Sequence, residues 1–388
     1  MALPALRIKP LVAAIEPAEG VAGTARSPRW VSLDAFRGLT IAGMILVNNP
    51  GSWEHVYGPL THAEWNGWTT ADLVFPFFLF IVGVAITFSL GDASARRSGR
   101  QTVRRILRRT ALLLLLGLAL NAVVSFAGLS TLRIPGVLQR IALCYLAGSL
   151  IFQSSGPRLQ ATLFAGLLIA YWLLLGLVPV AGRLPGWSDP QYNLAAHLDR
   201  RLIGEGHLYH ETWDPEGLLS TVPALATTLL GVLTGHWLRS RRGAAKKTAG
   251  LVVAGAVVLA AGLASDRWMP INKNLWTSSY VLFTGGMAMV LLAFCHWVID
   301  VKQIHRPLLP LVVFGVNPIA VYVLSTAGGE LLGRVMIRGT NLRERICDAL
   351  FAHWATPPAA SLLFAACYVL LWFGAMTALY RRKIFIKL

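Results

Sequence analysis

Long apolar runs recur along the chain and alternate with short polar segments. Each run is unbroken and rich in Leu and Ala, whereas strands of a membrane β-barrel alternate apolar and polar residues over about ten positions. A helix needs about 20 mostly apolar residues to cross a bilayer. The pattern therefore predicts an all-α integral membrane protein, a polytopic bundle of about ten transmembrane helices. The expected spans are roughly 36–50, 71–91, 110–127, 136–153, 160–181, 217–238, 249–265, 277–298, 309–326 and 357–379.

Two regions depart from this pattern. Residues 328–350 carry several arginines, which disfavour a complete span and leave a re-entrant or an interfacial helix as alternatives. Residues 1–30 include charged positions and no long apolar stretch, so they do not have the character of a signal peptide. We interpret them as a disordered cytoplasmic tail, followed by a single transmembrane domain over residues 31–388.

Composition and charge agree with a membrane protein. Of the 388 residues, 55% are hydrophobic and 14% are charged, well below the ~25% charged that is usual in soluble proteins. The net charge of +17 would suggest nucleic acid in a soluble protein. With the N-terminus inside, however, 23 of the 35 Lys and Arg residues fall in cytoplasmic segments and 10 in outer ones. The positive-inside rule therefore places both termini in the cytoplasm and explains the charge without a nucleic-acid partner.

Polar residues in or beside the spans are costly, so they mark candidate functional positions. The first span carries Arg37 near its cytoplasmic end and Asn48 and Asn49 at its outer end. Arg37 also suits a topological anchor, and the two asparagines also suit a helix end before Pro50. The four cysteines show no metal-ligand spacing, and we expect no metal site.

A second cluster precedes the second span on the outer side. His62 is a candidate general base, because imidazole titrates near neutral pH. Asp72 is a candidate orienting partner, and Trp65 and Asn66 lie between them as candidate sugar contacts. The alternative is a surface histidine and an acidic residue that favours a helix N-terminus.

Arg140 lies about one turn inside the fourth span and needs an anionic or carbonyl partner. An ion pair with Asp72 is one structural explanation, and Arg133 before the span is expected at the membrane interface. In the next outer loop, Asp214 and Glu216 accompany several aromatic residues. Carboxylates and aromatic faces suit a cationic sugar, although Asp-Pro-Glu also suits the start of a helix.

Lys273 stands between Asn272 and Asn274, just before the eighth span. This donor-rich segment suits an anion or a developing oxyanion, and an ordinary loop lysine is the alternative. Most of these clusters converge on the outer membrane face although they come from separate loops. From the residues alone, the chain is a polytopic membrane enzyme or transporter with an outward-facing polar site.

Six segments in a fixed order resemble the heparan-α-glucosaminide N-acetyltransferase family, and the resemblance covers about residues 30–380. The segments are LDAFRGLT at 33–40, VNNPG at 47–51, HAEWNGWTTADLVFPFFLFIVG at 62–83, RIPGVLQR at 133–140, DPEGLLST at 214–221 and PINKNLW at 270–276. The lysosomal members carry an extra lumenal domain and an extra span before this region. The chain resembles the short bacterial members, which implies a multi-pass protein of the bacterial cytoplasmic (inner) membrane.

The resemblance implies acetyl transfer from acetyl-CoA to the 2-amino group of a glucosamine across the membrane. The active-site histidine of the family matches His62, and its asparagine after the preceding span matches Asn48 or Asn49, of which we prefer Asn48. We assign Asp72 with them to catalysis. Without the lumenal domain, a small amino sugar or cell-wall fragment is the expected acceptor rather than a long heparan chain.

The remaining candidates follow from the same hypothesis. Sugar binding is assigned to Trp65, Asn66, Asp214, Glu216, Asn272, Lys273 and Asn274, and cofactor binding to Arg140, Arg37 and Asn49. Acetyl-CoA is cytoplasmic and His62 is outside, so we predict a cavity lined by spans one, two, four and eight, with Arg140 facing it. Arg104 and Arg108 are candidates for the cofactor phosphates, or else record topology.

Two other functions stay open at this stage. An O-acyltransferase acting on extracytoplasmic polysaccharide would give esters instead of amides, and an amino-sugar transporter would accumulate sugar without acetyl-CoA. Within the acetyltransferase hypothesis, the acetyl group passes either directly to the amine or through an acetyl-His62 intermediate. The expected partners are acetyl-CoA, the sugar and the lipid bilayer, and the oligomeric state, a homodimer included, is left open.

Overall fold

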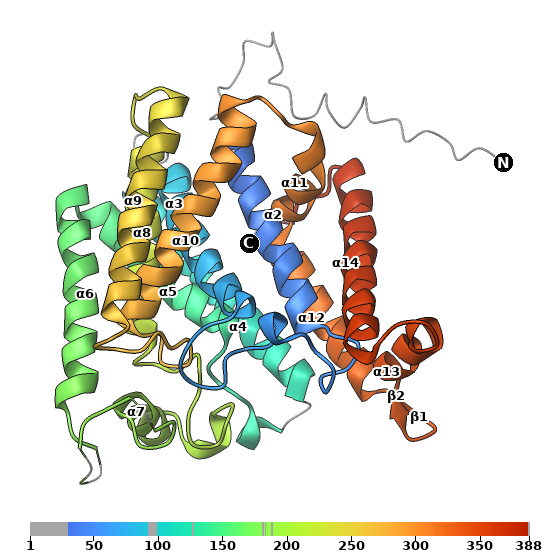
Figure 1. The fold of residues 1–388 in the computed structure, drawn as a ribbon. Coiled ribbons are helices and arrows are strands. Elements are labelled where there is room, and N and C mark those ends of the chain that lie inside the picture. The colour runs from blue at the N-terminus through green and yellow to red at the C-terminus, as the bar shows by residue number, and fades with distance from the viewer. Residues whose placement is uncertain are drawn as a thin grey trace.

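The computed structural model describes residues 30–91, 99–125, 128–180, 182, 184–187 and 189–386, and it is almost entirely helical (Figure 1). Within these ranges nine helices are long and apolar enough to cross a membrane, and one bent pair makes a tenth. This confirms a polytopic all-α membrane protein. The spanning helices are α2 Val31–Asn48, α3 Val74–Gly91, α4 Gly99–Ser125, α5 Val137–Ser154, α6 Pro157–Leu177, α8 Thr221–Leu238, α9 Ala244–Ser265, α10 Ser278–His296 and α14 Pro357–Arg381. The expected disordered tail lies outside the described residues, apart from residue 30.

Short elements connect and extend these helices. The helix α7, Leu194–Leu202, lies in the long loop before α8, and α13, Leu342–Cys347, lies before α14. A two-residue hairpin, β1 Met336–Ile337 and β2 Thr340–Asn341, precedes α13. The remaining turns are 3-10 helices at Gly58–Leu60, Thr70–Leu73, Leu129–Thr131, Glu205–His207 and Arg306–Leu308, and π-helical turns at Trp297–Val301 and Asp348–Ala352.

The bent pair replaces the single span expected at 309–326. Helix α11, Leu309–Val316, and helix α12, Pro318–Arg334, meet at an angle of 76°. The amide of Asn317 at the break donates to the carbonyl of Ile384 at 3.0 Å and accepts from the backbone N–H of Ile386 at 2.9 Å. The break is therefore fixed by a tertiary contact as well as by Pro318.

The region 328–350, which the sequence left between a re-entrant and an interfacial helix, divides into three parts. Its first residues complete α12, its middle forms the hairpin, and its end forms α13 and the π-helical turn. In Figure 1 the hairpin and α13 project sideways past α14, away from the rest of the bundle. Beyond α12, this region therefore lies at the periphery of the molecule.

Glycines allow two helix pairs to approach closely. A Cβ on Gly83 of α3 would lie 1.9 Å from the carbonyl oxygen of Thr228 in α8. A Cβ on Gly38 of α2 would lie 1.7 Å from the carbonyl oxygen of Leu311 in α11. Small residues at such crossings let backbones pack together where lipid gives no hydrophobic drive for association. Helix α2 is thereby tied to α11, and α3 to α8.

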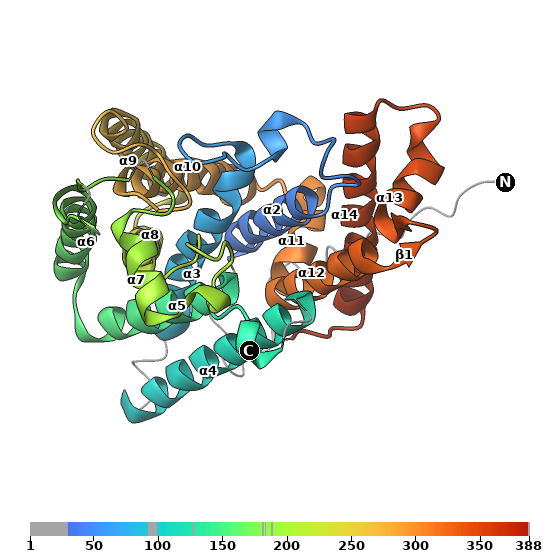
Figure 2. The same cartoon turned by 90° about the horizontal axis from the view of Figure 1, so that it is seen from below.

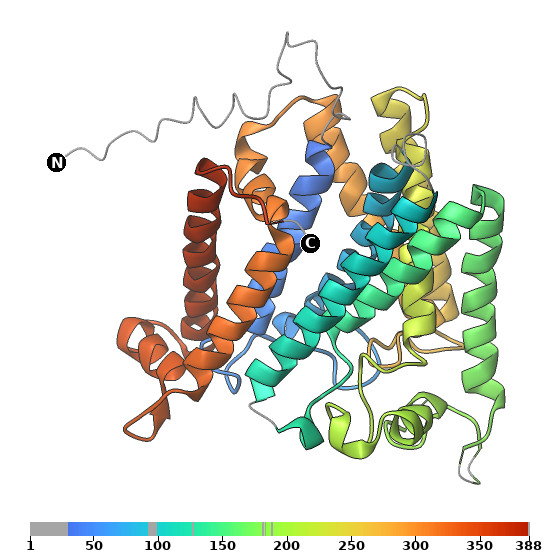
Figure 3. The ribbon, with the colours of Figure 1, turned by 180° about the vertical axis from the view of Figure 1, so that it is seen from behind.

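The bundle has two ends of different character (Figures 1 and 3). At one end lie the α2–α3 loop, α7 and the segment before α10, and we call this the site end. At the other lie the α8–α9 turn with its arginines and lysines and the start of α4, and we call this the basic end. Seen from the site end, α2, α11, α12 and α14 gather on one side and α3, α5, α8, α9 and α10 on the other, with α4 crossing beside both (Figure 2). The site end holds loops that the charge pattern assigns to the outside, and the basic end holds loops that it assigns to the cytoplasm.

Candidate active site

The candidate site is built around a histidine–carboxylate pair. The Nδ1 atom of His62 lies 2.7 Å from Oδ1 of Asp72. Asp72 is fully buried at the side chain, whereas 46% of the His62 side chain is exposed. A carboxylate accepts hydrogen bonds, so this contact places the imidazole proton on Nδ1. The Nε2 atom of His62 is then left with its lone pair and can accept a proton.

Asp72 is held in place from several directions. Its Oδ2 accepts the backbone N–H groups of Ala63 at 3.1 Å and Thr69 at 3.0 Å. With the Thr69 side chain this forms a capping box at the turn that starts the α3 segment. The hydroxyl of Tyr280 in α10 donates to the backbone carbonyl of Asp72. The carboxylate is therefore preorganised before any substrate binds.

Lys273 completes this group from a different loop. Its Nζ atom lies 3.3 Å from Oδ1 of Asp72 and 2.9 Å from Nδ1 of His62, so the two nitrogens share the Asp72 oxygen as their acceptor. Burial lowers the pKa of Lys273, and the carboxylates of Asp72 and Glu216 oppose this effect without cancelling it. The Asp72 carboxylate thus faces two cationic or hydrogen-bonding partners, and we call His62, Asp72 and Lys273 the catalytic cluster.

Two asparagines join the loops that carry this cluster. Asn272 donates to the side-chain oxygen of Asn66 at 3.1 Å, and Asn274 donates to the carbonyl of Glu64 at 3.4 Å. The backbone N–H of Gly67 also donates to the carbonyl of Ile271 at 2.8 Å. The predicted convergence of these two loops is confirmed, but the contacts of Asn66, Asn272 and Asn274 are with each other's loops.

A cavity of about 440 Å³ opens beside the catalytic cluster, within the range of 300–1,000 Å³ that is typical of ligand sites. At the site end it is lined by Asn48, His62, Glu216 and Lys273. Along α3 its lining runs from Val74 to Ser89, a distance of about 22 Å at the rise of an α-helix. The cavity therefore extends through most of a hydrocarbon core that is about 30 Å thick.

Two arginines line this cavity towards the basic end. Arg109 of α4 lies over the ring of Tyr145 at 4.6 Å, and within the described residues its Nε atom has no hydrogen-bond partner. Arg37 of α2 donates to Asp34 at 2.9 Å and to the carbonyl of Gly315 at 3.2 Å. The lining is otherwise mostly apolar, so the cavity joins a polar catalytic end to a cationic end.

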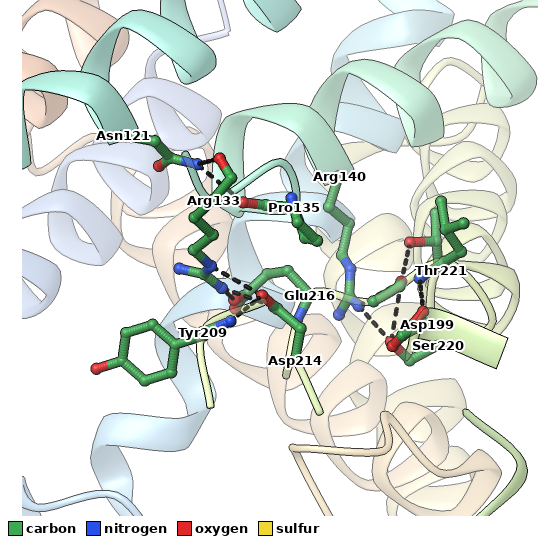
Figure 4. Close-up of polar contacts among 12 residues, drawn as sticks. Asn121, Arg133, Pro135, Arg140, Asp199, Tyr209, Asp214, Glu216, Ser220 and Thr221 are labelled. Carbon is green, nitrogen blue, oxygen red and sulfur yellow. Dashed lines mark hydrogen bonds and ion pairs between the residues drawn. The ribbon is translucent and has the colours of Figure 1, made fainter. Parts of the chain in front are cut away.

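A second charged group lies beside the cavity at the site end (Figure 4). Arg133 contacts both oxygens of Asp214, at 2.9 and 2.7 Å, and also donates to Glu216. Burial alone would lower the pKa of Arg133, but the two carboxylates outweigh burial and raise the pKa above its ordinary value. We call Arg133, Asp214 and Glu216 the paired cluster, because each charge in it has an opposite charge in contact.

Arg140 lies next to the paired cluster and is fully buried. Its guanidinium donates to the carbonyl of Gly217 at 3.1 Å and to the hydroxyl of Ser220, and it lies 5.0 Å from the ring of Trp276 (Figure 4). Neighbouring Asp199 is buried as well, and burial raises its pKa to about 7. Both residues fix the segment that leads from the outer loop into α8.

Comparison with known proteins assigns the chain to a family. Residues 29–264, more than half of the chain, match the model of the heparan-α-glucosaminide N-acetyltransferase catalytic region. The chain belongs to this N-acetyltransferase family. It is similar to the human heparan-α-glucosaminide N-acetyltransferase, with 31% identity over 355 residues, which cover 77% of this chain and 53% of the human protein. The mouse enzyme is 30% identical over 349 residues, covering 75% and 52% of the two chains. The chain thus spans about half the length of these curated relatives.

Besides His62, four residues predicted for the site of this N-acetyltransferase family member line the cavity. They are Asn48, Glu216, Lys273 and Arg37. Asp72 is buried and does not line the cavity, but it contacts His62, which does. Asn49 is buried, donates to the carbonyl of Ile45 at 2.9 Å and is absent from the lining, so the two asparagines divide between cavity and packing.

Two expectations about Arg140 are wrong. Arg140 does not face the cavity, because its guanidinium points to Gly217 and Ser220 instead. It makes no ion pair with Asp72 in the described structure either. Arg133, expected at the membrane interface, makes ion pairs with Asp214 and Glu216 in the paired cluster.

The expected lining by the eighth span is also wrong. Helix α10 supplies no lining residue, and Lys273 reaches the cavity from the loop before it. Helices α4 and α12 contribute instead, through residues such as Leu113 and Tyr322. Sequence reasoning missed Arg109 as a lining residue, because it belongs to the basic run at the start of α4 and nothing there distinguishes it from Arg105 or Arg108.

Trp65 lies away from the cavity and contacts aromatic residues of the loop that contains α7. Its indole N–H donates to the carbonyl of Trp187 at 2.9 Å, and its ring meets Trp213 edge to face at 5.2 Å. Trp213 in turn stacks on His210 at 4.3 Å. These rings hold the α7 loop against the loop of His62. In the part of the chain that is described, no group of three metal-binding side chains comes together.

Proposed function

We propose that the protein transfers an acetyl group from cytoplasmic acetyl-CoA to the amino group of a glucosamine-type sugar at the extracytoplasmic face. The observation that carries this proposal is the cavity that joins the catalytic cluster to the basic end. Membership in the N-acetyltransferase family supports the reaction class. A small amino sugar or cell-wall fragment is the proposed acceptor, and the bacterial cytoplasmic membrane is the proposed location.

Acetyl-CoA would enter the cavity from the basic end. Arg109 and Arg37 are the cations that would meet its phosphates there, because guanidinium groups suit phosphate oxygens. The slender pantetheine arm fits an apolar channel that follows α3 for about 22 Å from Ser89 to Val74. The thioester would then lie beside His62, while the nucleotide stays at the other end.

His62 acts in this proposal as the base for the acceptor amine. Its Nε2 atom takes a proton from the amine as the amine nitrogen attacks the thioester carbonyl carbon. The C–N bond forms, the C–S bond breaks, and the imidazolium returns the proton to the leaving thiolate. Asp72 keeps the Nδ1 proton in place and stabilises the transient imidazolium. Lys273 and Asn48, which also line the cavity, would be the donors to a developing oxyanion.

An acetyl-His62 intermediate is the alternative route. The same Nε2 atom would attack the thioester carbon, release the thiolate and pass the acetyl group to the amine. Acetyl-CoA labelled in the acetyl group, mixed without acceptor and quenched within milliseconds, distinguishes the two routes. Label recovered on a peptide containing His62 supports the intermediate, and label found only in acetyl-CoA supports direct transfer.

Proteoliposomes test the proposal as a whole. With labelled acetyl-CoA on the side of the basic end and glucosamine on the other side, we expect labelled N-acetylglucosamine to form on the sugar's side. His62→Ala should abolish product, whereas His55→Ala, an exposed histidine in the preceding loop, should not. Product formed only when both substrates are on one side would contradict transfer across the membrane.

The length of the cavity also suits a transporter, so the same vesicles test that function. An amino-sugar transporter would accumulate labelled glucosamine without acetyl-CoA and would tolerate His62→Ala. An O-acyltransferase would give an ester that hydroxylamine cleaves, whereas the proposed amide resists it. An amide product that requires His62 excludes both alternatives.

A further inference from the structure

A second pocket lies at the site end, apart from the cavity described above. It has a volume of about 290 Å³ and is enclosed by the loop after α2, the end of α12, the hairpin and the start of α13. Its polar and aromatic lining consists of Trp53, Glu330, Arg334, Asn341, Arg343 and Glu344. None of these residues lines the cavity beside His62. The pocket therefore has its own chemistry and needs its own explanation.

Arg343 is the central cation of this pocket. Only 6% of it is exposed, and its Nη2 atom donates to the carbonyl of Gly329. Its Nε atom has no hydrogen-bond partner within the described residues. A buried donor without an acceptor is unfavourable, so the pocket is suited to a ligand that supplies an acceptor. Phosphate oxygens match the fork of a guanidinium group best.

Beside Arg343, the pocket also holds acidic groups that suit a cation. Glu330 and Glu344 both line the pocket, and so does Trp53, which is 60% exposed. Glu330 also lies 3.8 Å from Arg334, so its charge is partly shared. A carboxylate and an aromatic face together bind ammonium groups. The pocket thus presents a phosphate-binding arginine and an ammonium-binding face within the span of one small molecule.

The surroundings of the pocket indicate where that molecule comes from. Met336 and Ile337 of the hairpin and Leu350 and Trp354 after α13 are all exposed, by 38–62%. The hairpin and α13 lie at the rim of the bundle beside α14 in both views (Figures 1 and 2). Exposed apolar and tryptophan side chains at this level of a membrane protein lie at the lipid interface. The ligand is therefore expected from the lipid and not from the aqueous phase.

We propose that this pocket binds the headgroup of a zwitterionic phospholipid of the phosphoethanolamine type. Arg343 contacts the phosphate, Glu344 and Glu330 contact the ammonium, and Trp53 covers it from the aqueous side. The acyl chains leave over the exposed hairpin residues and follow α14. This inference does not depend on the acetyltransferase reaction, because the two pockets share no lining residue.

Lipid binding to the purified full chain tests the proposal. Native mass spectrometry would follow the occupancy of added phosphatidylethanolamine and phosphatidylglycerol, which differ in the ammonium group. We expect one bound phosphatidylethanolamine and at least about tenfold weaker binding of phosphatidylglycerol. Arg343→Gln should weaken phosphatidylethanolamine by about tenfold or more. Arg338→Gln, with the same charge change in the exposed hairpin turn, should bind as the wild type does.

Glu344→Gln provides a second measurement that does not depend on a buried residue. Loss of the ammonium partner should bring the two lipids within about threefold of each other. Equal lipid occupancy in Arg343→Gln and Arg338→Gln at matched melting temperatures would overturn the proposal, and so would equal affinity for the two lipids. Glycerophosphoethanolamine binding as tightly as the lipid would show a site for a soluble phosphate compound, which also overturns it.

Discussion

Two charged clusters lie side by side at the site end, and they differ in how completely their charges are paired. In the paired cluster, Arg133 satisfies two carboxylates that are almost completely buried. In the catalytic cluster, the buried Asp72 is satisfied, but nearly half of the His62 side chain is open to the cavity. Residue types alone make the two groups look alike. The exposed side chain of His62 is what separates a site for chemistry from a structural ion pair.

The largest effect on this comparison is expected from Arg133→Ala. It leaves Asp214 and Glu216 buried without the cation that contacts them both, and removing one partner of a buried pair costs about 3–5 kcal/mol. We expect a marked fall in the apparent melting temperature in detergent, with loss of activity following the loss of fold. Arg201→Ala, an exposed arginine at the end of α7, is the control. Equal melting of the two variants would show that the paired cluster is not structural.

Asp72→Asn should lower the activity through the catalytic cluster, whereas Arg133→Ala lowers the stability. An amide still fills the site but no longer secures the Nδ1–H tautomer of His62 or stabilises the imidazolium. We expect kcat to fall by about 10²-fold, the scale of general acid–base effects, with little change in KM. Steady-state kinetics of this variant beside Glu64→Gln on the same loop measures it. A change confined to KM would mean that Asp72 binds substrate instead.

The pH dependence of stability should report on Asp199, which lies beside the paired cluster. Burial raises its pKa to about 7 in the folded protein, whereas an unfolded aspartate titrates near pH 4. Asp199 therefore makes its full contribution to the free energy of unfolding below about pH 4, and this contribution is lost as the pH rises to about 7. Asp199→Asn should melt like the wild type at pH 4 or below and several degrees higher at pH 8. A variant with an unchanged pH profile would rule out the shift.

Glu216 belongs to the paired cluster and also lines the cavity, so it sharpens the comparison. Burial alone would raise its pKa, but Arg133, Arg140 and Lys273 lower it, and the carboxylate stays ionised. Glu216→Gln should raise the KM for the amino sugar by about three- to tenfold, the value of one modest charge contact. The matched measurement uses acetyl-CoA as the varied substrate, for which no change in KM is expected. Equal changes for both substrates would assign Glu216 to packing alone.

The spans could be predicted from the sequence because each depends on local composition. Apolar runs fixed the positions of the helices to within several residues, although α2 begins at Val31 and α4 at Gly99, earlier than expected. The break at Asn317 could not be placed in this way. Its 76° angle depends on contacts with Ile384 and Ile386, which are nearly 70 residues away.

In the candidate site too, contacts between residues close in sequence could be predicted, whereas contacts between distant residues could not. His62 and Asp72 are ten residues apart on one loop, so their pairing could be anticipated. The contact between Arg133 and Asp214 joins residues 81 positions apart, and nothing in the local sequence distinguishes it from a sugar-binding carboxylate and an interfacial arginine. Arg140 was misjudged for a similar reason, because its partner carbonyl at Gly217 is invisible in the pattern of side chains.

The clamp formed by Asn317 has a practical consequence for handling the protein. Both polar atoms of one side-chain amide hold residues 384 and 386, and Ile386 lines the cavity. An affinity tag joined directly after this segment would strain the same few hydrogen bonds. Removing the segment would remove the contacts that fix the junction of α11 and α12. A purification handle attached through a long spacer should therefore yield material of higher specific activity than a handle fused without one.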